Sequence, residues 1–337
     1  MNYSALLKLS LGIVLVIIVA IFAFLLVGWP SKTPGVTYGM TFSRPYALEL
    51  GLDPDKTLSA ALDDVGIRRF RIAAYWKLLE PKEGEWDFSD LDKDIAAIGE
   101  RDGKVVLALG EKLPRWPECW GPDWYKGLPR KDQRAKTLRY IEKVVERYRD
   151  NPTVAAWQVE NEPHFRYGDC PAPDYLFIRQ ETEFVRSLDP TRPIQTTDSG
   201  ELSSWLTLGV FVDKLGISVY RVVRNPILGD MNLHYWFLPP YVYKRKALLA
   251  RPFGVTDVYV SEFQMEPWSN KSLDQTPIED QLSSIDIKQM RANFHFAERM
   301  GFKEIDFWGI EWWVWMKEKK DHPEFIDEAK SFWAEHR

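Results

Sequence analysis

From residue 36 onward, short apolar runs alternate with longer segments that repeat their apolar residues every three to four positions. Runs of six to nine residues with this character are candidate strands, and they span residues 36–42, 67–74, 104–110, 153–161, 193–198, 214–221, 257–263 and 304–310. Strands that alternate with helices are typical of parallel βαβ units, and eight such units in about 300 residues fit a (β/α)8 barrel. The pattern therefore predicts an α/β protein of the TIM-barrel class.

Two of the intervening segments carry clear helix boundaries. Residues 88–103 have an apolar stripe, a glycine at the end and Ser89 as a candidate N-cap, and residues 133–152 stop at the pair Asn151-Pro152. The regions 201–213 and 230–253 match neither the helical nor the strand period clearly.

The N-terminus is a separate unit. Residues 9–29 (LSLGIVLVIIVAIFAFLLVGW) contain no charge over 21 positions, and a bilayer core about 30 Å thick needs ~20 helical residues. A cleaved signal peptide is the alternative, with an apolar region of about 7–15 residues and a small-residue cleavage motif. This segment is longer and no convincing motif follows it, so a single transmembrane anchor is favoured.

The anchor divides the chain into four parts. We expect a short cytoplasmic segment at 1–8, the anchor at 9–29, a linker at 30–35 and one barrel domain at 36–337. Lys8 and the free amine precede the span and Lys32 follows it, which leans toward an N-terminus inside and a barrel outside the cytoplasm.

Composition removes several classes of function. The net charge is −5 with a pI of about 5.7 and no long basic run, so nucleic acid is an unlikely partner. The five histidines form no H-x-H or H-E-x-x-H, and no G-x-S-x-G, G-x-G-x-x-G or P-loop occurs, so neither a metal nor another cofactor is expected. The 15 Trp and 14 Tyr suit either sugar binding or core packing.

Two strand ends carry glutamates. Glu160 and Glu162 lie two residues apart in WQVENEP, so within a strand both would face the same side. Glu162 falls at the end of strand four and Glu262, in VYVSEF, at the end of strand seven; Glu266 is a less favoured alternative because it lies beyond the apolar run. Barrel active sites lie at these ends, and two carboxyls across the mouth suit cleavage of a glycosidic bond.

The motifs together resemble a known clan. WQVENEP with YVSEF is similar to the clan A (β/α)8 retaining glycoside hydrolases, and FRIAAYWKLLEPKEGEWDFSDLD and IDFWGIEWW are similar to their second and eighth strands. The resemblance covers residues 36–315 and is closest to cellulase-type family 5 and β-galactosidase-type family 42. Strand six carries Ser218-Val219-Tyr220 in place of the His-x-Tyr of many family 5 members, which argues against a simple family 5 assignment.

The resemblance implies roles. Glu162 would be the general acid/base and Glu262 the nucleophile; Asn161 would bind the sugar 2-hydroxyl, and Arg71 would keep Glu262 ionised. The remaining substrate-binding candidates are Tyr220, which would contact the nucleophile, Trp308, which would floor the subsite of the cleaved sugar, Trp76 and Trp268. Alternatively, Arg71 is the buried partner of Glu160, and Tyr220 and Trp308 are core aromatics.

Three further expectations concern contacts. A buried Glu160 needs a partner, for which Arg71 or Arg69 on strand two is the candidate. Cys119 and Cys170 follow neighbouring strands three and four, so in an oxidising compartment we expect a disulfide beside the cleft, the alternative being two free thiols. We also expect aromatic residues of the catalytic face among Trp116, Trp120, Trp124, Tyr125, Tyr235, Trp236, Trp268, Trp312, Trp313 and Trp315.

The sequence thus predicts a membrane-anchored, monomeric retaining β-glycosidase that hydrolyses a β-linked oligo- or polysaccharide. A transglycosylase with the same two glutamates is one alternative. The other is a carbohydrate-binding protein that keeps the barrel without turnover.

Overall fold

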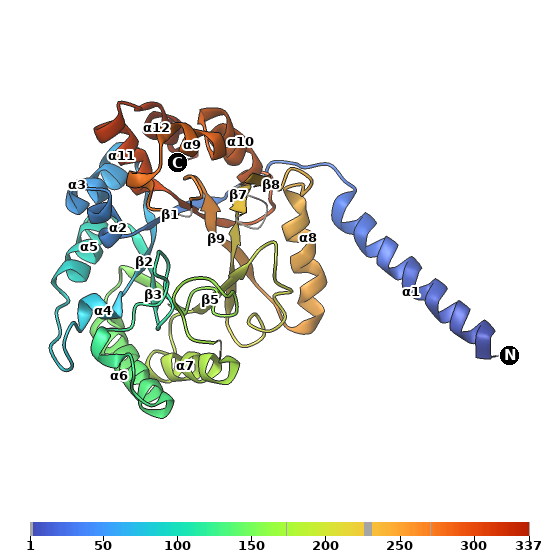
Figure 1. Ribbon diagram of the computed structural model, residues 1–337, viewed down its shortest axis with the longest axis horizontal. Helices are drawn as coiled ribbons and strands as arrows, with labels where there is room; N and C mark the ends of the chain where they lie inside the picture. Colours follow the sequence, from blue (N-terminus) through green and yellow to red (C-terminus); the bar gives the residue numbers. More distant parts are fainter. Residues whose placement is uncertain (1–2, 173, 226–230, 270, 337) are drawn as a thin grey trace.

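The computed structural model describes residues 3–172, 174–225, 231–269 and 271–336. Eight parallel strands close into a barrel in the order β1-β10-β9-β6-β5-β4-β3-β2, with helices around it (Figure 1). The strands of the barrel are β1 Thr37–Phe42, β2 Arg69–Ala73, β3 Lys104–Leu109, β4 Val154–Val159, β5 Ile194–Ser199, β6 Lys214–Val219, β9 Val258–Gln264 and β10 Glu304–Trp308. Each lies within or within one residue of a predicted strand, and the (β/α)8 prediction is confirmed.

The helices cover the outside of this barrel (Figure 1). They are α2 Arg44–Glu49, α3 Pro54–Ser59, α4 Trp76–Leu79, α5 Ser89–Gly99, α6 Arg130–Tyr148, α7 Tyr175–Leu188, α8 Tyr241–Ala250, α9 Ile278–Ser284, α10 Ile287–Ala297, α11 Ile310–Lys320 and α12 Glu324–Glu335; one more helix, α1 Tyr3–Leu26, precedes the barrel. The N-cap prediction for Ser89 is wrong by one position: Ser89 is already helical, and its backbone N–H donates to the Asp87 side chain over 2.9 Å. The predicted stop at Asn151-Pro152 lies three residues beyond the end of α6.

The barrel strands are buried almost throughout. All seven residues of β9 are buried, including the polar Ser261, Glu262 and Gln264. A buried charge needs a partner of opposite sign, and Arg69 of β2 pairs with Asp306 of β10 over 2.7 Å near the start of the strands. The barrel interior is therefore partly ionic.

The region after β6 contains elements that the sequence did not reveal. β7 Val222–Asn225 and β8 Met231–His234 form an antiparallel two-stranded sheet outside the barrel, and α8 follows. Two four-residue strands and a helix of ten residues are too short for a distinct hydrophobic period.

Helix α1 projects away from the barrel on the side of α8 (Figure 1). Its 20 residues Leu7–Leu26 are apolar except at Lys8, Ser10 and Gly12, and none of them is buried against the protein. By length and composition this segment suits either a membrane span or a signal sequence. The first two residues of the predicted cytoplasmic segment lie outside the described residues.

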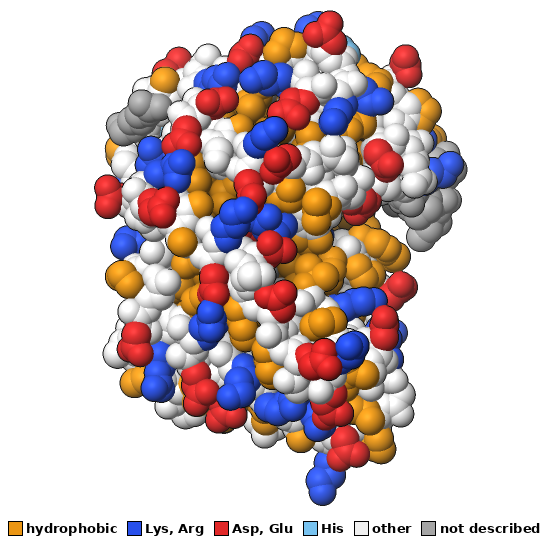
Figure 2. Space-filling view, turned by 90° about the vertical axis from the view of Figure 1, so that its left-hand side faces the viewer, with side chains coloured by type: hydrophobic (Ala, Val, Ile, Leu, Met, Phe, Trp, Pro, Cys, Tyr) orange, Lys and Arg blue, Asp and Glu red, His pale blue; other side chains and the backbone are white. Residues whose placement is uncertain are grey.

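The face that includes α2, α3 and α5 carries acidic and basic side chains interspersed over most of its area (Figure 2). No large field of one sign occurs on this face, as expected for an ordinary solvated surface.

Candidate active site

The two predicted catalytic glutamates lie at the same end of the barrel. Glu262 is the fifth residue of β9, and Glu162 follows β4 by three residues. Both belong to the carboxyl-terminal ends of the strands, where the side chains of β2, β4, β6 and β9 converge. Their surroundings differ.

Glu262 is buried and held by two donors. Arg71 Nη1 donates to Glu262 Oε1 over 2.6 Å, and Tyr220 Oη donates to Oε2 over 3.1 Å. Arg71 is completely buried; its Nε donates to Gln158 Oε1 over 2.7 Å, and its Nη2 donates to Asn161 Oδ1. The predicted contacts of Arg71 and Tyr220 with Glu262 are present.

Glu162 has no cation at its carboxyl among these contacts. Ser218 Oγ donates to its Oε1 over 2.5 Å, and its backbone N–H donates to Thr197 Oγ1 over 2.8 Å. Glu162 is largely but not fully buried. This burial, and after it the neighbouring charge of Glu262, raises the pKa of Glu162 to about 8.

Glu160 does not face the same way as Glu162, so that prediction is wrong. The strand ends at Val159, and both glutamates have left-handed backbone, with φ of 59° at Glu160 and 42° at Glu162. The alternation of sides applies only inside a strand. Consequently Gln158, not Glu160, points into the barrel toward Arg71.

The predicted partners of Glu160 are wrong as well. Its carboxylate accepts the backbone N–H of Glu111 over 2.7 Å and that of Lys112 over 2.6 Å. Burial, the largest effect, raises the pKa of Glu160 to about 7. Glu160 therefore holds the loop after β3 through backbone hydrogen bonds.

A cleft of about 490 Å³ opens beside Tyr220, whose hydroxyl donates to Glu262. Tyr220, Trp268 and Trp308 line it, as expected for substrate-binding candidates, and the rings of Tyr220 and Trp268 meet edge to face with centroids 5.2 Å apart. The lining contains four more aromatic residues: Tyr46, Trp116, Trp120 and Tyr167. These rings supply the flat apolar surfaces that sugar binding requires.

The prediction that Trp76 binds substrate is wrong. It is completely buried, its ring stacks on Tyr140 with centroids 4.9 Å apart, and its Nε1 donates to Glu80 over 2.8 Å. Trp76 is thus a core residue and not a substrate-binding residue.

Several other aromatic residues expected at the catalytic face are also core residues. Trp312 and Trp313 are buried in α11, where their indole N–H groups donate to Gln281 and to the Met265 carbonyl over 2.7 and 2.8 Å. Trp315 and Tyr125 are likewise buried. Residues Ile310–Met316 of α11 are buried on all sides of the helix, so its tryptophans pack in the core and do not form a binding surface.

The floor of the cleft contains an ion cluster. Arg115 lies between the rings of Tyr46 and Trp308, 3.8 and 3.9 Å from their centroids, and its Nη2 donates to Glu266 over 3.1 Å and to Glu311 over 2.9 Å. Trp308 Nε1 also donates to Glu266, over 2.7 Å. Glu266 therefore has a structural partner set, which supports Glu262 over Glu266 as the second site carboxylate.

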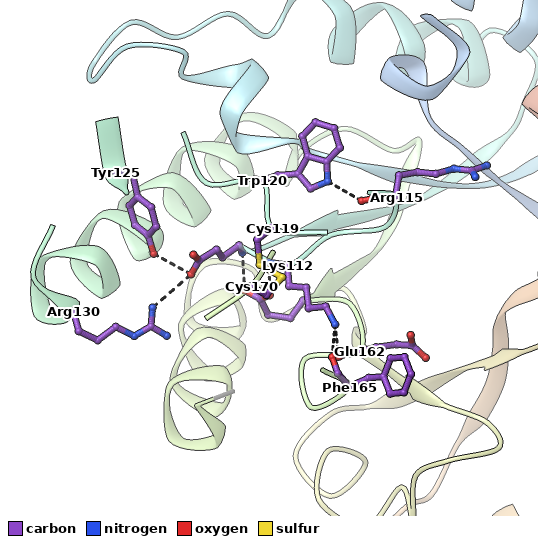
Figure 3. The surroundings of a disulfide bond; sticks show 11 residues. Lys112, Arg115, Cys119, Trp120, Tyr125, Arg130, Glu162, Phe165 and Cys170 are labelled. Atoms are coloured by element: carbon purple, nitrogen blue, oxygen red, sulfur yellow. Dashed lines mark hydrogen bonds and ion pairs between the residues drawn. A yellow bond between two sulfur atoms is a disulfide. The ribbon is translucent and has the colours of Figure 1, made fainter. Parts of the chain in front are cut away.

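The predicted disulfide is confirmed: Cys119 and Cys170 are bonded, with Cα atoms 5.2 Å apart (Figure 3). Beside it, Lys112 Nζ donates to the backbone carbonyls of Glu162 and Phe165 over 3.0 and 2.7 Å. The loops after β3 and β4 are thus joined both covalently and by this ammonium group.

Comparisons with known proteins relate the chain to glycoside hydrolases. The family model for Cellulase (glycosyl hydrolase family 5) matches residues 32–198, just under half of the chain. The chain is 33% identical over 129 residues to β-galactosidase Bga of Halorubrum lacusprofundi and 35% identical over 182 residues to mannan endo-1,4-β-mannosidase F of Aspergillus fumigatus. These alignments span 31% and 48% of this chain but only 17% and 38% of the two relatives.

The fold has counterparts among solved structures. Xylanase 10B of Thermotoga maritima superposes with a TM-score of 0.58 at 17% identity, over 90% of this chain and 97% of that one. The chain carries a clan A glycoside hydrolase barrel.

Several site residues of this glycoside hydrolase barrel were not predicted from sequence. Ser218 was noted only as a departure from the His-x-Tyr pattern, yet it holds Glu162. Arg115 and Glu118 lie in an irregular loop with φ of 80° and 71° and line the cleft. Burial, and the nearby Glu262 and Glu162, raise the pKa of Glu118 well above its usual range, although Lys112 opposes this. The only signal was the density of charge and aromatic residues between Glu111 and Tyr125.

Proposed function

We propose that the chain is a retaining β-glycosidase in which Glu262 is the nucleophile and Glu162 the general acid/base. The observation that carries the proposal is the contrast between the two carboxyls. Glu262 accepts from a guanidinium and a phenol, whereas Glu162 accepts from a hydroxyl and has a raised pKa. A pair of carboxyls whose surroundings favour opposite protonation states divides into nucleophile and acid.

The reaction has two steps. In the first, Glu262 attacks the anomeric carbon while Glu162 transfers its proton to the departing glycosidic oxygen, so that the glycosidic bond breaks and a glycosyl ester on Glu262 forms. In the second, Glu162 takes a proton from water, and the resulting oxygen nucleophile displaces Glu262. The configuration at the anomeric carbon is retained, and Glu162 is protonated again.

The neighbouring groups fit these steps. Tyr220 and Arg71 stabilise the Glu262 carboxylate when it leaves in the second step. Asn161 lies between the two glutamates in the hydrogen-bond network, because its Oδ1 accepts from Arg71 and, over 2.8 Å, from Thr197. Its amide nitrogen is the group that we assign to the sugar 2-hydroxyl, and Trp308 is the floor of the subsite.

The substrate class is a β-linked oligo- or polysaccharide. The named relatives are a β-galactosidase and an endo-1,4-β-mannosidase, which supports a hexose at the cleaved bond. A transglycosylase would use the same residues with a sugar hydroxyl in place of water. A binding protein without turnover is disfavoured because both carboxyls keep distinct partners.

We further propose that α1 is an uncleaved anchor and that the barrel acts outside the cytoplasm as a monomer. The disulfide supports an oxidising compartment. Extraction of the full chain should require detergent, and a mature protein in the medium that starts after Gly28 would show that α1 is a signal peptide.

The decisive experiment uses Glu262→Ala and Glu162→Ala with an activated aryl β-glycoside and azide. Both variants should lose nearly all turnover of natural substrates. With azide, Glu262→Ala should form the inverted α-glycosyl azide and Glu162→Ala the retained β-azide, identified by NMR. Exchanged products would reverse the two roles, and full activity in both variants would locate the site elsewhere.

A further inference from the structure

The end of α1 is fixed to one face of α8. Tyr241 Oη donates to the carbonyl oxygens of Leu26 and Gly28 over 2.9 and 3.0 Å. Arg245 donates to the carbonyls of Phe24 and Val27, and its guanidinium lies 4.3 Å from the centre of the Tyr241 ring. The last carbonyls of a helix need such donors, so α1 leaves the protein directly beside α8.

The same face of α8 continues as exposed apolar surface. Leu248 and Leu249 follow Arg245 by three and four positions, which places them on the face of Tyr241 and Arg245. They are 49% and 38% exposed, and Phe253, just after the helix, is 65% exposed. Apolar residues in one continuous exposed group are typical of an interaction site.

The segment before α8 carries two further exposed aromatic residues. Trp236 is 81% exposed and Phe237 is 51% exposed. We call Trp236, Phe237, Leu248, Leu249 and Phe253 the α8 surface.

Its charges are of one sign. Helix α8 (YVYKRKALLA) contains three basic residues and no acidic one, and Arg251 follows it. Lys244 and Arg251 are exposed at its edge. Basic side chains beside exposed Trp, Phe and Leu are the composition of a protein surface that lies in the interface of an anionic bilayer.

We propose that the α8 surface rests on the lipid bilayer that α1 enters, with its apolar side chains at the headgroup boundary and Lys244 and Arg251 on anionic lipid headgroups. The proposal rests on α1 being an uncleaved anchor and is independent of the glycosidase reaction. Lipid is the expected occupant because Tyr241 and Arg245 of α8 bind the end of α1, so a bilayer that contains α1 lies next to this surface.

The contact would orient the active site. α8 connects the parallel strands β6 and β9, so it runs back along the barrel wall. With this wall on the bilayer, the cleft at the end of the barrel opens parallel to the membrane, toward material that lies along the cell surface.

The test uses the full chain in lipid nanodiscs. Because Cys119 and Cys170 are bonded to each other, a single introduced cysteine can be labelled selectively with the environment-sensitive dye NBD. Trp236→Cys and Leu248→Cys report on the α8 surface, and Leu48→Cys is the matched control, exposed on α2 across the barrel from α8 (Figure 1).

Labels at 236 and 248 should show blue-shifted emission and at least threefold stronger quenching by headgroup-region spin-labelled lipid than the label at 48. Charge reversal by Lys244→Glu with Arg251→Glu should reduce that quenching in discs with phosphatidylglycerol more than in discs of phosphatidylcholine alone. Equal, water-like signals at all three positions would overturn the proposal. So would native protein that lacks residues 1–28, whatever its glycosidase activity.

Discussion

Arg71 Nη1 lies 2.6 Å from Glu262 Oε1, and both side chains are buried. The same guanidinium also donates to Gln158 and Asn161 of the strand-four segment. One planar cation with donors in fixed directions thus connects the proposed nucleophile to the residue proposed to bind the substrate. Arg71 uses three different nitrogens for these bonds, whereas a lysine ammonium carries all its donors on one nitrogen and could not reach the three acceptors in their present positions.

Arg71→Lys should therefore reduce kcat/KM by at least ~100-fold, and Arg71→Met should lower the free energy of unfolding by ~3–5 kcal/mol because it leaves a buried carboxylate without its cation. Steady-state kinetics and urea unfolding measure the two effects. Arg147→Lys is the control, since Arg147 pairs with Asp92 on the surface and should change stability by less than about 0.5 kcal/mol. A near-normal kcat/KM in Arg71→Lys would show that the planar arrangement of the guanidinium donors is not needed.

The pH dependence of activity should follow Glu162. Its pKa of about 8 means that the acid form needed for the first step persists at neutral pH and is lost above pH 8. The alkaline limb of kcat/KM should therefore bend near pH 8 with a poor leaving group. In Glu162→Gln, the residual rate on an activated aryl glycoside, which needs no acid, should lack this limb; a limb that persists would assign it to another group.

The same group should make stability fall as pH rises. Its pKa is about 8 in the folded protein and near 4.5 when unfolded, so the folded state binds the extra proton. The contribution is complete below about pH 4.5 and disappears as the pH passes 8. Between pH 5 and 8 the wild type should lose on the order of 3–5 kcal/mol relative to Glu162→Gln. Parallel pH curves for the two proteins, from urea unfolding, would contradict this.

Arg115 should be required for both stability and binding. Its removal leaves Glu266 and Glu311 without their shared cation and takes away one stacking partner of Trp308. Arg115→Met should cost ~3–5 kcal/mol and raise KM, whereas Arg115→Met with Glu266→Gln should recover part of the stability. A double-mutant cycle without coupling between the two positions would exclude the proposed cluster.

Loss of the disulfide should weaken the site as well as the fold. Cys119→Ser with Cys170→Ser should destabilise the protein by ~2–4 kcal/mol. It should also lower kcat/KM by roughly tenfold, because Arg115 and Glu118 then lie on a loop with fewer constraints. Thermal unfolding and steady-state kinetics measure the two effects. The control is the wild-type protein, measured in the presence and in the absence of reductant. If kcat/KM of the double variant were unchanged, the disulfide would contribute to stability but not to catalysis.

The eight strands and the pair Glu162 and Glu262 were predictable because buried parallel strands appear as apolar runs and their ends carry polar residues. The direction of Glu160 was not. It depends on the backbone turning left-handed one residue after Val159, and no residue type in VENEP requires that turn. The prediction for Trp76 was wrong for a related reason. The sequence shows that Trp76 follows a strand, but its direction depends on packing against Tyr140 in the core.

The Cys119–Cys170 bond also lines a cavity other than the cleft. Both cysteines line a second cavity, of about 320 Å³, together with Glu160 and Glu181, while Glu118 on the near side lines the substrate cleft. The disulfide therefore forms part of the wall of this second cavity, beside Glu160. Smaller residues at the two cysteine positions would enlarge the cavity next to this carboxyl and leave the loops that enclose it without their covalent link.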